Sequence, residues 1–323
     1  MKASRREFIR KAGLFGSGFI VALKAGAWVS RLSSRVRIGL IADLHHDIMH
    51  DGLMRMKAFS EGMKEAEPDA IIQLGDFAYP NPGNRAVIDL FNNCNPNSLH
   101  VIGNHDTDNG HTKDQCIDNW GMKGRYYEQD INGIKILVLD GNDKGSPDHK
   151  GGYPSFIGKE QLNWLEDKLD NTGMPVLLAS HQPLAGPYAV DNAPKLQALL
   201  GRHSEKVILS VNGHSHIDSL IKIDGVPYLH INSASYQWVG GDFKHDSYSS
   251  ELHEKFPWIS YTCPYRDPLF ALLEIDAASG IISVIGKKSI WVGKSPAQLG
   301  KKWDGVVENG VEVVPEIRDR DEL

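Results

Sequence analysis

The sequence is poor in cysteine and has no long hydrophobic run. Its three cysteines, Cys94, Cys116 and Cys263, form no CxxC pair, which excludes a disulfide framework and a thiolate zinc site. An oxidising compartment would allow one disulfide among them, and no pair is favoured. The longest apolar stretch, residues 12–23, is shorter than the roughly 20 residues of a membrane-spanning helix, so we expect no stable membrane span. Repeats, heptads and low-complexity tracts are also missing, which excludes solenoids, coiled coils and disordered proteins.

Outside the first 27 residues, acidic side chains clearly outnumber basic ones. The chain has 35 basic and 41 acidic residues and a formal net charge of −6. Residues 1–27 carry six bases against Glu7 alone, so the remainder is more acidic than the whole. An acidic body has no general field that would hold a polyanion. We therefore expect no nucleic-acid polymer as a partner.

The first 27 residues are typical of an export signal. Basic residues around Arg5 and Arg6 precede the apolar residues 12–23, and the small residues 25–27 follow at the spacing of a cleavage site. The paired arginines, followed by Phe8 and Ile9, resemble a bacterial twin-arginine signal. The resemblance implies a signal peptide over residues 1–27, a partner in the twin-arginine export machinery, and a periplasmic or otherwise exported protein. The alternative is a basic amphipathic helix of a cytoplasmic protein.

Apolar periodicity predicts an α/β domain. Amphipathic helices are predicted over residues 53–66 and 159–169 from apolar side chains at three- and four-residue steps. Strands that alternate with helices indicate layered packing with substantial parallel pairing. A β-hairpin is predicted from the runs 269–275 and 281–292, followed by a polar tail on the surface. Six earlier runs predict buried strands, at 36–42, 70–74, 99–102, 134–139, 176–179 and 207–211.

Side chains of metal-binding types directly follow five of these six runs. The carboxyl ends of strands in an open α/β sheet form a ligand crevice, so these side chains are expected at one rim. Residues two apart on an extended strand face the same side, which pairs Asp43 with His45 and His214 with His216. A lone HxH or GD is usually without function, but five such elements in order indicate a site. The residues are Asp43, His45, Asp76, Asn104, His105, Asp106, His181, His214 and His216.

The donor types suit borderline divalent metals. Two carboxylates, four imidazoles and one amide favour Mn, Fe, Co, Ni or Zn. A single metal would leave several of these polar groups without a partner, so two metals fit better.

In order, the elements DxH, GD, GNHD, a lone His and GHxH resemble the calcineurin-like metallophosphoesterases. The resemblance covers residues 36–293 and implies an α/β fold with two mixed β-sheets sandwiched between helices (αββα). It places one metallophosphoesterase domain at 35–293 and a C-terminal tail at 294–323. It implies two divalent metal ions, Mn, Fe or Zn. One metal would be bound by Asp43, His45 and His216, the other by Asn104, His181 and His214, with Asp76 bridging.

The resemblance also implies hydrolysis of phosphoric esters. A hydroxide bridging the metals would attack phosphorus, and His105 would protonate the leaving group as a general acid without binding metal. Asp106, the next residue, is predicted to orient His105. A second aspartate, common three residues after the GD element, is absent here because Ala78-Tyr79-Pro80 follow Phe77. That departure concerns the loop and not the metal ligands.

Loops outside the motifs would select the substrate. Residues 236–265 contain eight aromatic residues. This segment is either a loop pinned to the domain by its own apolar cluster or a cap that stacks on a flat leaving group. Residues 124–127, 139–143 and 161–165 resemble the branch acting on nucleoside diphosphate derivatives and cyclic nucleotides. We predict hydrolysis of phosphomonoester or phosphodiester bonds of small substrates. The alternatives are a nucleoside-diphosphate-type pyrophosphatase (ADP-ribose/CDP-alcohol-like), a cyclic-nucleotide phosphodiesterase, and a non-enzymatic metal-binding scaffold, which the complete ligand set and His105 disfavour.

Overall fold

The computed structural model describes residues 35–276, 278–303 and 313–323. The signal peptide predicted over residues 1–27 lies outside the described residues. Among the described helices, none is both long and apolar enough to cross a membrane. The three cysteines are free thiols, so the structure contains no disulfide among them.

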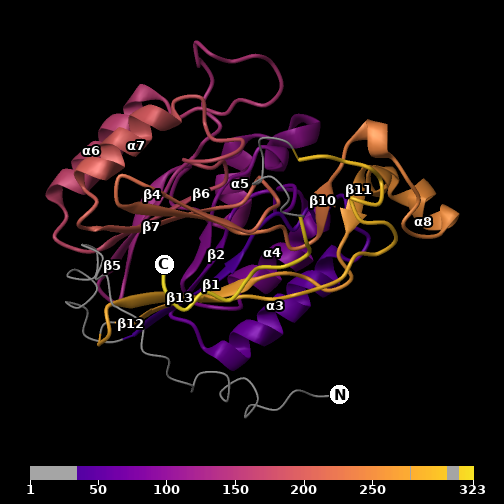
Figure 1. Ribbon diagram of the computed structural model, residues 1–323, viewed down its shortest axis with the longest axis horizontal. Helices are drawn as coiled ribbons and strands as arrows, with labels where there is room; N and C mark the ends of the chain where they lie inside the picture. The colour runs from indigo at the N-terminus through magenta and orange to yellow at the C-terminus, as the bar shows by residue number, and fades with distance from the viewer. Residues whose placement is uncertain (1–34, 277, 304–312) are drawn as a thin grey trace.

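Two large sheets form the centre of the molecule, and each combines parallel and antiparallel pairs (Figure 1). The first has the order β13-β12-β1-β2-β3, and the second β4-β5-β6-β7-β9-β8. The strands of the first sheet are β1 (Val36–Ile41), β2 (Ala70–Gln73), β3 (Ser98–His100), β12 (Ala271–Asp276) and β13 (Ile281–Ile285). Those of the second are β4 (Tyr127–Ile131), β5 (Ile134–Val138), β6 (Val176–Ser180), β7 (Val207–Asn212), β8 (Ser219–Ile223) and β9 (Val226–His230).

Helices cover the outer face of each sheet. In Figure 1, α6 and α7 lie together on one side of the molecule and α3 on the opposite side, with the sheets between them. The α-helices are α3 (Gly52–Ala66), α4 (Arg85–Asn92), α5 (Lys113–Trp120), α6 (Lys159–Asn171), α7 (Ala193–Arg202) and α8 (Ser250–Lys255). Short 3-10 helices are η1 (Pro82–Asn84), η2 (His105–Gly110), η3 (Gly241–Phe243) and η4 (Pro257–Tyr261).

Side-chain alternation along the strands builds three apolar layers. Ile136 and Val138 of β5 pack between the sheets against residues of β1, whereas Leu137 between them packs under α6 and α7. On the other side, Met56 and Phe59 of α3 are fully buried against the first sheet. A strand buried on both faces needs apolar residues at every position, which is why the six runs are continuous. The two sheets and the helices on the outer face of each make four layers of secondary structure, which confirms the predicted αββα fold.

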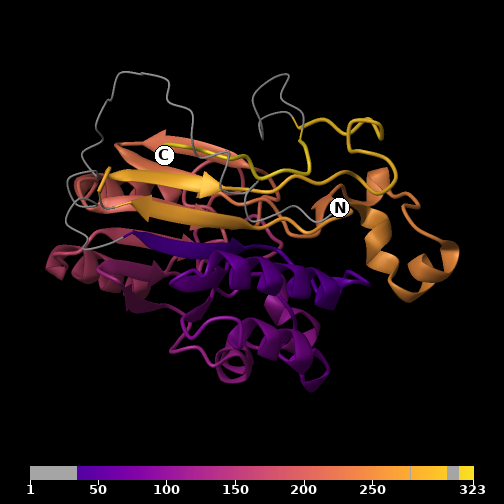
Figure 2. The same cartoon turned by 90° about the horizontal axis from the view of Figure 1, so that it is seen from below.

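A small lobe extends from one end of the sheets. Residues 236–265, which we call the aromatic lobe, contain β10 (Tyr236–Trp238), η3, α8, η4 and β11 (Thr262–Pro264). In Figures 1 and 2 α8 lies at the end of the molecule beyond the strands. The lobe has its own cluster in which Tyr236 and Ile259 pack on Met49. This cluster confirms that the segment is pinned to the domain by apolar contacts.

The predicted surface tail is corrected in its last part. Residues 313–323 run beside β13 (Figure 2), where Val284 and Arg320 exchange backbone hydrogen bonds of 2.8 and 2.9 Å. Ile317 is 1% exposed and belongs to the core between the sheets. The apolar residues of this segment, Val313, Val314, Ile317 and Leu323, are scattered among charged ones without a regular period, so the pattern did not reveal this packing. The predicted hairpin is present as β12 and β13, although its second strand ends earlier, at Ile285.

Candidate metal centre

The predicted ligands converge at the carboxyl ends of the parallel strands. Those strands are β1, β2, β3, β6 and β7, and the loops after them meet through backbone hydrogen bonds. The amide of Asp43 donates to the Gly75 carbonyl (3.0 Å) and that of His45 to the Asp76 carbonyl (2.9 Å). These bonds continue the pairing of β1 with β2 beyond the strands. The structure therefore brings together all seven residues predicted as metal ligands, in two groups.

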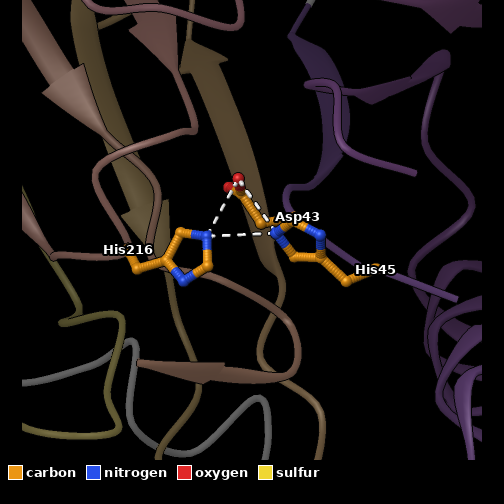
Figure 3. Close-up of side chains that lie close together, drawn as sticks. All are labelled: Asp43, His45 and His216. Atoms are coloured by element: carbon orange, nitrogen blue, oxygen red, sulfur yellow. Dashed lines mark hydrogen bonds and ion pairs between the residues drawn. The ribbon is translucent and has the colours of Figure 1, made fainter. Parts of the chain in front are cut away.

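The first group contains Asp43, His45 and His216 (Figure 3), whose ligand atoms lie within 4.8 Å of one another. Nε2 of His216 lies 3.3 Å from Nε2 of His45 and 3.2 Å from a carboxylate oxygen of Asp43. Nδ1 of His216 donates to the Tyr236 carbonyl (2.8 Å). A neutral imidazole that donates from Nδ1 keeps its lone pair on Nε2, which here faces the other donors.

The second group contains Asp76, His181 and His214, which meet the same distance limit, and Asn104 beside them. Nε2 of His181 lies 3.2 Å from Oδ2 of Asp76, 3.0 Å from Oδ1 of Asn104 and 3.1 Å from Nδ1 of His214. Nδ1 of His181 donates to the Leu74 carbonyl (2.8 Å). This contact again directs the Nε2 lone pair toward the neighbouring donors.

Asp76 joins the two groups. Its Oδ2 lies 3.7 Å from Nε2 of His45, in the first group, as well as 3.2 Å from His181 in the second. Burial alone would raise the pKa of Asp76, but the neighbouring imidazoles, His181 foremost, hold it well below its usual value. The residue is thus a carboxylate with access to both groups, as a bridging ligand requires.

Burial favours the uncharged, metal-binding form in two of the ligand imidazoles. Burial lowers the pKa of His45 well below 6.5 and that of His214 to about 3. His181 differs, because the Asp76 carboxylate overcomes the effect of burial and raises its pKa to about 9. A metal bound by His181 and Asp76 would take the place of that proton. The donors present therefore fit two divalent ions.

Backbone conformation sets these residues apart from the rest of the chain. Among the described residues, ten non-glycine residues have positive φ. Five of them are predicted ligands, namely Asp43, His45, Asp76, His214 and His216, with φ between 46° and 65°. Non-glycine residues rarely adopt this region, because it costs free energy. The residues that do adopt it cluster at functional sites. The cost indicates that the fold holds the ligands in place for a reason other than stability.

Two motif glycines allow ligands from different strands to approach. A Cβ atom at Gly103 would lie 2.2 Å from the backbone nitrogen of Asp76. At Gly213 it would lie 2.6 Å from a carboxylate oxygen of Asp43. Both distances are far inside van der Waals contact, so the glycines of GNHD and GHxH serve close packing around the ligands.

The structure places His105 beside the two groups and corrects the role of Asp106. Asp106 is buried, and its carboxyl oxygens accept hydrogen bonds from the amides of Asp76, Phe77 and Gly103 at 2.7–2.9 Å. It therefore ties the loop after β2 to the loop after β3. Adjacent side chains on a helical turn diverge, which explains why Asp106 points away from the His105 ring. Burial, reinforced by Asp76, raises the pKa of Asp106 to about 8.

The imidazole of His105 is held by residues that sequence reasoning missed. Its Nδ1 donates to Oδ2 of Asp108 (2.8 Å), and the Tyr153 hydroxyl donates to the same carboxylate (2.8 Å). The backbone amide of His105 donates to Asp76 (2.8 Å). Asp108 follows His105 by three residues, a spacing that brings side chains together on a helical turn, so the sequence did contain a signal for this contact. Tyr153 lies 48 residues from His105 and gave none.

A cavity of about 360 Å³ opens beside the ligands. His45, Asp76, His105, His214 and His216 line it on one side. The other walls come from β10 and from separate loops and are largely aromatic, with Tyr153, Tyr188, Tyr236, Trp238 and Trp303 beside Lys301, Ser215 and Gln237. Trp120 and Tyr127, which precede β5, belong instead to packing in the domain.

Comparisons with known proteins agree with this geometry. A family model described as calcineurin-like phosphoesterase matches residues 36–218, more than half of the chain. Among solved structures, a dimetal phosphatase from Danio rerio is similar, with a TM-score of 0.56 and 14% identity over 80% of this chain and 99% of that one. GAP50, the anchor in the inner membrane complex of Plasmodium, has a TM-score of 0.53 and 15% identity over 88% and 90%. At such identities the likeness shows the fold. No curated protein matches the sequence.

Proposed function

Because the chain belongs to the calcineurin-like phosphoesterase family and is a hydrolase of phosphoric esters, we propose that it acts on small phosphomonoesters or phosphodiesters. The observation that carries the proposal is the sharing of Asp76 by two ligand groups, with His105 and a small cavity on one side. A non-enzymatic scaffold would have no use for this complete donor set. The cavity volume falls within the range of small-molecule sites.

The residues divide into metal ligands and a proton donor. Asp43, His45 and His216 would hold one divalent ion, and Asn104, His181 and His214 the other, with Asp76 shared. Mn, Fe and Zn all suit this mixture of imidazole, carboxylate and amide. When bound, the ions supply an activated water and neutralise charge on the phosphoryl oxygens.

His105 has the position of a general acid. Its Nδ1 is held by Asp108, which leaves Nε2 as the nitrogen that can give a proton to the leaving oxygen. The Asp76 carboxylate and the contact with Asp108 outweigh the effect of burial and raise the pKa of His105 above 6.5. A protonated imidazole near neutral pH is the form that this role needs.

The test is a panel of phosphomonoesters, phosphodiesters and nucleoside diphosphate compounds, assayed with the full chain loaded with Mn, Fe or Zn. His105→Ala should retain both metals by elemental analysis and lose about 10²- to 10⁴-fold in turnover on alkyl esters. Activated aryl esters need little protonation of the leaving oxygen and should lose much less. His111→Ala, a nearby histidine that packs on Tyr79, is the matched control. Equal losses on both ester types would reduce His105 to an electrostatic role.

A nucleoside-diphosphate-type pyrophosphatase is the second candidate. Lys301 lines the cavity together with the metal ligands, and a second phosphate could bind its ammonium group. The same panel separates the two candidates. A preference for diphosphate compounds that Lys301→Met removes would favour the pyrophosphatase.

We also propose export through the twin-arginine route to the periplasm, on the sequence of residues 1–27. This route carries folded proteins, which suits an enzyme that acquires its metals before export. Replacing Arg5 and Arg6 by lysine should keep the protein in the cytoplasm in active form. Normal amounts of the double variant in the periplasm would refute the proposal.

A further inference from the structure

We propose that the cavity binds a flat ring in the leaving group of the substrate, and that Trp238 is the surface on which this ring stacks. The inference rests on the proposed function and specifies its substrate class, phosphate esters of ring-bearing alcohols. Aryl and nucleobase rings share the chemistry that such a surface recognises, because both present a π face.

Exposed aromatic side chains are concentrated at this cavity. Among the described residues, four large aromatic side chains are markedly exposed: Tyr153 (46%), Tyr188 (50%), Trp238 (39%) and Trp258 (55%). The first three line the cavity. They come from three separate parts of the chain, so local composition does not explain their meeting. Leaving such rings in water forgoes hydrophobic stabilisation, and a cluster of them marks a ligand site.

Trp238 is a preorganised stacking surface. Its indole is stacked on the Tyr261 ring, with centroids 5.6 Å apart and planes 7° apart. The pairing of β10 with β11, where Trp238 lies opposite Thr262, fixes the backbone beneath it. A ring already held in one orientation loses little conformational entropy when a ligand binds.

Strand geometry places Trp238 one step beyond the metal ligands. Tyr236 lies two positions earlier on β10, so both side chains point to the same face. The Tyr236 ring is 4.9 Å from the His45 ring and 5.2 Å from that of His216. The Trp238 ring is a further 6.4 Å from Tyr236. Trp238 is therefore within reach of a ring carried by a phosphate ester whose phosphoryl group lies at the ligands.

The test compares esters that differ in flatness and only slightly in leaving-group basicity. Naphthylmethyl phosphate and decahydronaphthylmethyl phosphate both release a primary alcohol, so a difference in kcat/KM reports recognition of the ring. We expect the metal-loaded full chain to prefer the flat ester about tenfold. Trp238→Ala should reduce this ratio to near one, and Trp238→Phe should retain most of it.

Trp258→Ala is the matched control. Trp258 belongs to the same lobe and contacts Tyr261 (5.2 Å between rings), but it does not line the cavity. This variant should keep the tenfold ratio. An equal loss of the ratio in Trp258→Ala would overturn the inference, as would an unchanged ratio in Trp238→Ala or no preference in the wild type. Comparing a nucleoside 5′-monophosphate with ribose 5-phosphate then distinguishes a nucleobase from an aryl ring.

Binding separates failure of this inference from failure of the proposed function. The naphthylmethyl and decahydronaphthylmethyl phosphonates are not hydrolysed, and calorimetry gives their Kd values with wild type and both Trp238 variants. A flat-ring preference that depends on Trp238 supports the inference even if no ester is turned over. Hydrolysis of both esters without any preference in rate or binding refutes the inference and leaves the proposed function standing.

Discussion

The two ligand groups differ in what holds their histidines. In the second group, His181 donates to the carbonyl of Leu74, which immediately follows core strand β2. In the first group, His216 donates to the carbonyl of Tyr236 in the aromatic lobe, and the Tyr236 ring stacks on His45. The second group thus depends on the sheet, and the first depends also on a segment about 190 residues from β1.

The dependence of the first group on the aromatic lobe extends to the backbone. The hydroxyl of Ser233 donates to the Asp43 carbonyl (2.9 Å), and that of Ser235 donates to the Leu44 carbonyl (2.7 Å). The chain leading into the lobe therefore fixes the loop that carries Asp43 and His45. Ligands supported by strand ends should tolerate changes in the lobe, and ligands supported by the lobe should not.

The largest effect should come from the residue that the groups share. Asp76→Asn should weaken both metals, whereas Asp43→Asn should weaken only the first. Activity should fall by about 10³-fold or more in each variant, because metal stabilisation of the transition state is worth several kcal/mol. Metal content per chain, measured by elemental analysis, distinguishes the variants. Two metals retained in Asp76→Asn would contradict the shared role.

A smaller effect should follow loss of the carboxylate that holds His105. Asp108→Asn should lower kcat by about 10- to 100-fold with little change in KM, since a misoriented acid costs turnover and not binding. The loss should be greater for poor leaving groups, and both metals should remain. Asp114→Asn, an exposed acid in the first turn of α5, is the control. An effect equal for all leaving groups would argue against a positioning role.

Removing the Tyr236 ring should affect the two groups unequally. Tyr236→Ala should weaken the first metal about tenfold, as is usual when a contact supporting a ligand is lost, and leave the second unchanged. Metal titration followed by calorimetry should resolve the two binding events. Tyr126→Ala removes a tyrosine that packs on Trp164 away from both groups and should change neither. Equal weakening of both metals would remove the distinction between the groups.

The smallest effect concerns the pH dependence of folding stability and should come from a histidine outside both ligand groups. Burial lowers the pKa of His100 to about 3, and its ring is held by Gln73 and Asn92. Below pH 6.5 the unfolded chain gains a proton at this site that the folded chain does not, so stability should fall as pH drops from 6.5 toward 3. Urea unfolding with chelator present should show a weaker pH dependence in His100→Gln. The control His149→Gln, at an exposed position, should keep the slope of the wild type.

Much of the fold was predictable because its signals are local. The six buried runs became β1, β2, β3, β5, β6 and β7 with ends displaced by one or two residues. Continuous apolar runs report burial on both faces of a sheet, which does not depend on the partner strand. The positions of the predicted ligands were equally local, since each directly follows such a run.

The sequence by itself determined the αββα layering and the residues delivered to the rim of the sheets. Only the tertiary structure decided how those residues are held and what faces them. It placed Asp108 and Tyr153, instead of Asp106, at His105, packed Ile317 of the supposed tail into the core, and assembled the cavity from rings on distant segments of the chain. The physical reason is that strand and helix formation depend on neighbours along the chain. Contacts such as those of Tyr153 with Asp108 and His105, 45 and 48 positions apart, depend on the path of the whole backbone, which leaves no periodic trace in the sequence.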